Sequence, residues 1–152
     1  MLIRTHLAIT AFFILLFLQH VSNQILFVIA ALIATFIPDI DSGFSTLGKK
    51  GIFKILQVIT KHRGIIHSFT FCLLISLILA IFFPLFAFAF FLGYALHLIA
   101  DSFTQEGITP FWPYSKTSAG IIRTGGRIET SFFLSMIILD LILLVIIVAR
   151  LF

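Results

Sequence analysis

The residues from Ser68 to Asp101 contain no charged side chain before the last of them. A membrane-spanning helix needs roughly 20 consecutive apolar residues, and Pro84 divides this stretch in two because proline interrupts a helix interior. Hydrophobic residues make up 61% of the 152-residue chain and charged residues only 11%, which lies far outside the composition of soluble domains. We therefore predict an all-α integral membrane protein.

Five apolar segments predict about five transmembrane helices. They cover residues 7–18, 23–37, 68–83, 85–103 and 131–149. Arg4 followed by a short apolar run resembles a signal peptide, but the next residues lack a small-residue cleavage site. We therefore predict an uncleaved first helix with Thr5 as its N-cap. Residues 1–152 would form a single transmembrane helical domain, because the chain leaves no room for a separate soluble one.

The loop after the second apolar segment carries a two-faced helical pattern at residues 51–61. Apolar side chains at Ile52, Ile55 and Ile59 alternate with Lys54 and Lys61 at helical spacing. This pattern predicts an amphipathic helix that lies on an anionic lipid surface. A short connecting helix packed on the bundle is the alternative.

The basic residues predict the orientation in the membrane. Five spans place the N-terminus and both large loops on one side, which is cytoplasmic by the positive-inside rule. Only Arg150 falls on the other side, and the cytoplasmic set comprises Arg4, Lys49, Lys50, Lys54, Lys61, Arg63, Lys116, Arg123 and Arg127. The net charge of +4 is thus spread over loops, which favours anionic lipid rather than nucleic acid as the partner. The sequence assigns no oligomeric state.

Most imidazole and carboxylate groups fall at the cytoplasmic ends of the predicted spans or in the cytoplasmic loops. His97 and Asp101 are four residues apart, which places them on one helix face. His20 lies at the opposite end of the first helix and Asp140 lies in the middle of the last one, so neither should join them. The groups that can meet are His6, Asp39, Asp41, His62, His67, His97, Asp101 and Glu106.

So many polar groups at membrane depth are costly unless they are paired or bound to metal, since each charged group costs about 2.5–3.5 kcal/mol there. A divalent metal is the simplest common partner. Mixed imidazole and carboxylate ligands suit zinc first, with manganese or iron as alternatives, and the number of ligands allows one or two ions. The predicted metal ligands are His6, Asp39, Asp41, His62, His67, His97 and Asp101.

Two local patterns support this prediction. After Pro38, the two-residue spacing of Asp39 and Asp41 lets both carboxylates point the same way if the segment is extended. His62 and His67 flank Arg63, so one turn could deliver two imidazoles and a guanidinium suited to phosphate.

Each pattern also has a purely structural interpretation. A histidine such as His6 at a helix end is commonly a hydrogen-bonded interfacial residue. Asp-x-Asp after proline is often only a turn and a helix cap. His97 and Asp101 could simply hydrogen-bond each other. The structural interpretation explains poorly why all these groups fall on one side.

The segments FIPDID, KHRGIIHSF, GYALHLIADSFTQEGI and FWPYSK follow an N-terminal Thr-His in this order. This ordered set resembles the YdjM-like family of LexA-binding, inner-membrane-associated metal-dependent hydrolases, over most of the chain up to about Lys116. The resemblance implies a multi-helix membrane protein with hydrolase activity. It points to the same seven metal-ligand positions, whereas Glu106 falls where the family is not expected to carry an acidic residue.

The predicted function is metal-dependent hydrolysis at the cytoplasmic membrane surface. The substrate would be a phospholipid or another lipid-linked phosphoester, because the site would open at the level of the headgroups. A metal ion would activate a water molecule, with Asp41, Asp101 or Glu106 as general base. Arg63 would hold an anionic headgroup.

Two other functions compete with this prediction. Lipid phosphatases of the phosphatidic-acid type also use a histidine followed four residues later by aspartate, with the histidine as nucleophile. Their accompanying motifs are missing here. The second alternative is a membrane protein that binds metal as a sensor, carrier or scaffold without catalysis.

Overall fold

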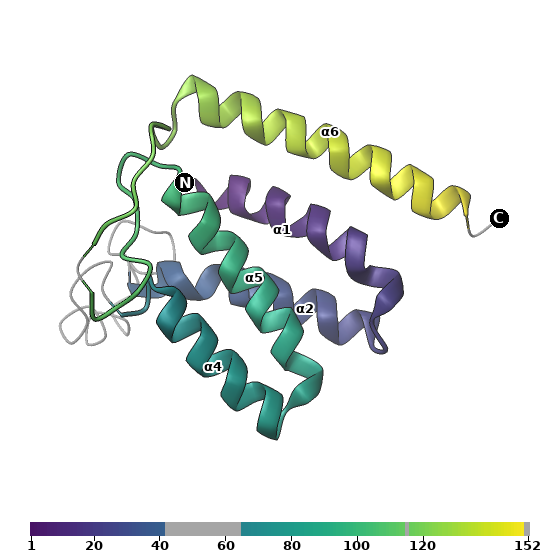
Figure 1. Cartoon of the computed structure of the whole chain (residues 1–152). Coiled ribbons are helices and arrows are strands. Elements are labelled where there is room, and N and C mark those ends of the chain that lie inside the picture. The colour runs from purple at the N-terminus through teal and green to yellow at the C-terminus, as the bar shows by residue number, and fades with distance from the viewer. Residues whose placement is uncertain (42–64, 115, 151–152) are drawn as a thin grey trace.

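The computed structural model of the chain describes residues 1–41, 65–114 and 116–150. These residues form five α-helices and two short 3₁₀ helices, and no β-strand occurs among them. In chain order the elements are α1 (Ile3–Phe17), η1 (Leu18–His20), α2 (Gln24–Phe36), η2 (Ile37–Asp41), α4 (Phe69–Phe82), α5 (Pro84–Ser102) and α6 (Arg127–Ala149) (Figure 1). The predicted all-α fold is confirmed, while the amphipathic helix predicted at residues 51–61 lies outside the described residues.

Among the described residues, three helical segments are long and apolar enough to cross a membrane, namely Ile3–His20, Pro84–Ser102 and Arg127–Ala149. The segments Gln24–Asp39 and Phe69–Phe82 are apolar but shorter. Because an α-helix rises 1.5 Å per residue, α4 extends only about 21 Å, against a hydrocarbon core of roughly 30 Å. These two helices would need local thinning of the bilayer to span it.

Two helices begin earlier than the apolar pattern predicts. α1 begins at Ile3 with Leu2 as its N-cap, so the prediction that Thr5 caps this helix is wrong. Thr5 is instead buried, and its hydroxyl donates a hydrogen bond to Glu129. α6 begins at Arg127, four residues before its predicted start, and Glu129 lies in its first turn. A carboxylate there is stabilised by the positive end of the helix dipole.

The segment after α2 differs from its prediction. α2 ends just before Pro38, as expected, but Ile37–Asp41 then forms a 3₁₀ helix rather than an extended strand. With three residues per turn, positions two apart point about 120° away from each other. The predicted alignment of Asp39 and Asp41 depended on an extended segment, and residues 37–41 do not meet this condition. The Asp41 side chain itself lies outside the described residues.

Helix α5 lies at the centre of the bundle and packs against α1, α2 and α4. Its closest approach to α2 is at Gly93, where a Cβ atom would lie 2.1 Å from the carbonyl oxygen of Ala31. Only glycine allows the two backbones to come this close. One helical turn further along each helix, Thr35 and His97 meet, so this close approach fixes the position of the imidazole.

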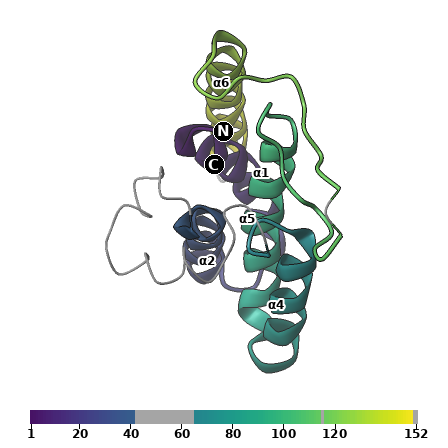
Figure 2. The same ribbon diagram turned by 90° about the vertical axis from the view of Figure 1, so that its left-hand side faces the viewer.

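Helix α6 is held differently. It packs against α1, and most of its apolar side chains are exposed, as expected for a helix that faces lipid. Arg4 of α1 lies over the ring of Phe133, 5.1 Å from its centroid. Figure 2 shows α6 and α4 on opposite sides of the bundle, with α1 and α5 between them.

Candidate metal centre

Four helical elements bring polar side chains to one end of the bundle. His6 lies in the first turn of α1, Asp39 in η2, and His67 just before α4, while His97 and Asp101 occupy the last two turns of α5. Figure 1 shows the start of α1 beside the carboxyl end of α5, next to the loops. Residues far apart in the sequence therefore meet, because the helices run alternately toward and away from this end of the bundle.

Asp101 lies at the centre of this cluster. Its Oδ1 atom is 3.3 Å from Nε2 of His6. Its Oδ2 atom is 3.5 Å from Nε2 of His67 and 3.5 Å from Nε2 of His97. On the far side of His97, the same Nε2 atom is 3.8 Å from Oδ1 of Asp39. One carboxylate thus faces three imidazoles, and a second carboxylate lies beside the most central of them.

The orientation of His97 is set by the backbone of α2. Its Nδ1 atom is 2.8 Å from the carbonyl oxygen of Thr35. A carbonyl oxygen only accepts hydrogen bonds, so Nδ1 carries the proton and Nε2 keeps its lone pair. Carbonyl groups in the last turn of a helix have no helical partner, which leaves the Thr35 oxygen available. A histidine whose other nitrogen bonds to a backbone carbonyl is the usual arrangement of a metal ligand.

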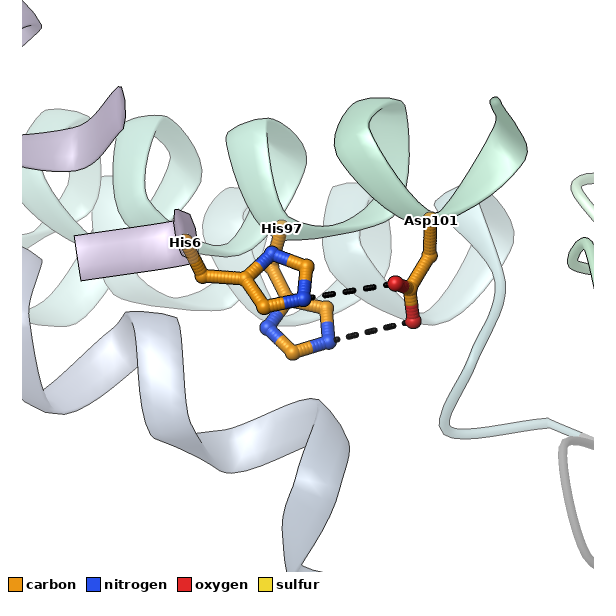
Figure 3. A group of neighbouring side chains, drawn as sticks. All are labelled: His6, His97 and Asp101. Atoms are coloured by element: carbon orange, nitrogen blue, oxygen red, sulfur yellow. Dashed lines mark ion pairs between the residues drawn. The ribbon is translucent and has the colours of Figure 1, made fainter. Parts of the chain in front are cut away.

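The rings of His6 and His97 stack on each other. Their centroids are 3.9 Å apart and their planes differ by 5°. Figure 3 shows both rings turned toward Asp101, with the two ion pairs running to its two oxygen atoms. The ring of His67 meets His97 edge to face, with centroids 5.6 Å apart.

This arrangement provides two sets of donor atoms for a metal ion. The first set is His6, His97 and Asp101, and the second is Asp39, His67 and His97. Within each set, one atom of every residue lies within 4.8 Å of the others. Imidazole nitrogen and carboxylate oxygen are the ligands of zinc and of manganese or iron sites, so the donors fit a divalent metal.

Burial strengthens this assignment. The three histidines and Asp101 are each at most 2% exposed. Among the described residues, Nε2 of His97 and both ring nitrogens of His6 have no hydrogen-bond partner. Buried polar atoms of this kind are rare unless water or an ion satisfies them. The Met1 ammonium also contacts Oδ1 of Asp101, so this carboxylate has a cationic partner within the protein as well.

The structure brings together His6, Asp39, His67, His97 and Asp101 of the predicted site. Glu106 is exposed in the loop after α5 and belongs to neither donor set. His62, Arg63 and the Asp41 side chain lie outside the described residues. His20 is exposed at the other end of α1, and Asp140 is half-buried within α6. Neither residue belongs to a donor set, in keeping with the prediction for both.

Sequence reasoning missed Glu129, which lies fully buried at the same end of the bundle. Its Oε1 atom accepts hydrogen bonds from the backbone N–H of Leu2 (2.6 Å) and the hydroxyl of Thr5 (2.8 Å). Its Oε2 atom accepts one from the backbone N–H of Gly125 (2.6 Å). A glutamate three residues after a Gly-Gly pair is a helix-start signal that could have been recognised. Its contacts with α1 could not.

The fold and the cluster define a class: an all-α membrane protein with a buried histidine and aspartate cluster at one end of its helices. The chain matches the family model described as YdjM inner membrane protein over residues 1–151, and it belongs to this family. It is therefore an inner-membrane protein. The match includes the last helix, so the resemblance extends beyond the predicted limit near Lys116. Neither a curated protein nor a solved structure matches the chain.

Proposed function

We propose that this protein is a membrane-bound, metal-dependent hydrolase that acts at the cytoplasmic surface on a phospholipid or another lipid-linked phosphoester. The observation that carries the proposal is Asp101, a buried carboxylate whose two oxygens face three imidazole nitrogens at 3.3–3.5 Å. Beside it, both ring nitrogens of His6 and Nε2 of His97 have no hydrogen-bond partner among the described residues, and buried polar atoms in this state are costly. The family membership supports an inner-membrane location.

The protein residues would hold one or two ions, with zinc favoured by the imidazole-rich set. His97 belongs to both donor sets, so its loss would affect either ion. When bound, such an ion supplies Lewis acidity and lowers the pKa of a water molecule toward about 7. The backbone carbonyl of Thr35 would keep His97 in its ligating tautomer.

The remaining polar residues would handle protons and substrate. Asp101 is surrounded by imidazoles and is best used as a ligand, so the general base would be Asp41 or Glu106. Arg63 would bind the phosphate group, since a guanidinium forms two parallel hydrogen bonds to phosphate oxygens.

We further propose that all five α-helices of the single domain cross the membrane, with the N-terminus and both large loops in the cytoplasm. In this orientation the cluster lies at the level of the lipid headgroups. Labelling of a Ser118→Cys variant tests the orientation. Modification in inside-out vesicles but not in intact spheroplasts agrees with it, and the reverse pattern contradicts it.

A hydrolysis screen tests the enzymatic proposal. Purified protein is stripped of metal, reloaded with zinc, manganese or iron, and offered phospholipids and lipid-linked phosphoesters. We expect metal-dependent release of a phosphate-bearing or alcohol product from at least one class. Asp101→Asn should abolish it and His20→Ala should leave it unchanged. Activity that survives metal removal and the Asp101→Asn change would contradict the proposal.

One observation favours a second function. The imidazoles and Asp101 are almost fully buried, which also suits a site that holds metal for structure or sensing rather than for turnover. Stoichiometric metal with no hydrolysis of any substrate class would select this alternative. The third alternative, a phosphatase with His97 as nucleophile, predicts a phosphorylated His97 that forms without metal.

A further inference from the structure

We propose that the turn at residues 111–114 inserts its aromatic side chains into the lipid headgroup layer beside the histidine and aspartate cluster. This turn lies in the loop between α5 and α6. The inference concerns a contact with the membrane in which the protein resides, and it does not depend on metal binding or hydrolysis.

The turn exposes three large aromatic side chains on the surface of the protein. Phe111, Trp112 and Tyr114 are 62%, 44% and 76% exposed. The backbone N–H of Tyr114 donates to the carbonyl of Phe111 (2.8 Å), which closes the turn. On either side of the turn along the chain, Ile108 and Ser118 exchange two backbone hydrogen bonds of 2.9 and 2.8 Å. The aromatic residues are therefore presented at the end of a hydrogen-bonded loop.

The loop is anchored at the start of α4. The backbone N–H of Phe69 donates to the carbonyl oxygen of Pro110 (2.8 Å), directly before the turn. Phe69 is the first residue of α4 and lies two residues after His67. Figure 1 shows the loop running along the end of the bundle where α4 begins and α5 ends. The aromatic turn thus lies beside the start of α4, which in the topology proposed above is where this helix leaves the membrane.

The chemistry of these residues fits the headgroup layer. Tryptophan and tyrosine are enriched at both membrane interfaces because each combines an apolar ring with one polar group. Lys116, Arg123 and Arg127 of the same connection are exposed, and cations there attract anionic lipid headgroups. An open hollow at the start of α6 is lined by Arg123, Gly125 and Arg127. A connection that carries both exposed aromatic rings and exposed cations is suited to a lipid surface.

The location of the turn has a consequence for access to the cluster. If the turn lies among the headgroups, the end of the bundle near His67 faces the leaflet rather than the open cytoplasm.

Trp112 is the single tryptophan of the chain, so its fluorescence reports on this turn alone. The full-length protein is placed in nanodiscs of phosphatidylglycerol and phosphatidylethanolamine, in which both faces of the bilayer are open to solutes. Phospholipids brominated at shallow or deep acyl positions are added in parallel samples. We expect stronger quenching by the shallow bromines than by the deep ones, blue-shifted emission, and weak quenching by iodide.

A variant gives the matched reference. Trp112→Phe combined with Ile138→Trp moves the tryptophan to an exposed position in the middle of α6, where deep bromines should quench more strongly than shallow ones. Strong iodide quenching of Trp112 without bromolipid quenching would place the turn in water. Protection from both quenchers would mean that protein covers the turn, either another segment of the chain or a second copy. Either result would overturn the proposal.

Discussion

Asp101 and Glu129 are both buried carboxylates at the same end of the helix bundle, yet their surroundings differ. Glu129 accepts hydrogen bonds from two backbone N–H groups, of Leu2 and Gly125, and from the hydroxyl of Thr5. Asp101 faces the Nε2 atoms of three histidines at 3.3–3.5 Å. Burial and charge are thus nearly the same, and only the partner groups distinguish the two sites.

This difference separates a structural carboxylate from a candidate ligand. An amide N–H can only donate, so the contacts of Glu129 satisfy that carboxylate without any further group. An imidazole has a lone pair on one nitrogen when neutral, which can bind a metal ion together with the neighbouring carboxylate. Glu129 thus joins α6 to the start of α1, whereas Asp101 belongs to the candidate metal centre.

The largest expected effect follows from removing His97, the imidazole shared by both donor sets. We expect His97→Ala to lower metal affinity by more than the roughly 10–100-fold that changes around a ligand cost. The measurement is a zinc competition titration in detergent. Unchanged zinc affinity in the folded variant would show that His97 and Asp101 form only a structural hydrogen-bonded pair and do not bind metal.

A smaller effect, on stability rather than metal, is expected for Glu129. Glu129→Ala leaves two backbone N–H groups and a hydroxyl without their acceptor, and each such buried group costs about 1–3 kcal/mol. Thermal unfolding in detergent should show a clear decrease, with Glu129→Gln intermediate because its amide oxygen still accepts. Metal content per folded chain should not change, and a loss there would erase the distinction from Asp101.

Thr10 and Thr35 provide a neutral reference for both carboxylates. Their buried hydroxyl groups are 2.9 Å apart and join α1 to α2. Thr10→Val removes one hydroxyl while Thr35 still donates to the carbonyl of Ala31, so we expect a loss of only about 1 kcal/mol. A calorimetric comparison with Glu129→Ala checks this order. A larger loss for Thr10→Val would show that charge is not what makes Glu129 important.

The smallest effect is expected for His20, which is exposed at the far end of α1. His20→Ala should leave metal affinity and unfolding temperature unchanged within error. A loss of metal in this variant would contradict the placement of the cluster at one end of the bundle.

The apolar pattern predicted the helices because hydrophobicity and proline positions act locally. Pro84 correctly separates α4 from α5, and Ser68 caps α4 by accepting from the N–H of Phe71. Helix starts were less predictable. α6 begins at Arg127 because Glu129 has partners on α1, a contact between residues more than 100 positions apart that no local pattern reveals.

The cluster was predictable in part for a similar reason. Topology alone predicts His6, His67, His97 and Asp101 at one end of the bundle. Each successive membrane span runs in the opposite direction to the one before it, so the starts of some spans and the ends of others lie on the same side. The local conformation after Pro38 was not predictable, because a 3₁₀ helix and an extended strand are both compatible with that short segment. The contact of His97 with the Thr35 carbonyl depends on the close packing at Gly93, which only the folded structure shows.

The most direct test of the metal centre is the metal content of three purified proteins: wild type, Asp101→Asn and Glu129→Gln. Both substitutions replace a buried carboxylate by an amide of the same shape. Elemental analysis should find one or two zinc, manganese or iron ions per chain in wild type and Glu129→Gln, and almost none in Asp101→Asn. Equal metal content in all three proteins, or its loss from Glu129→Gln alone, would contradict the account.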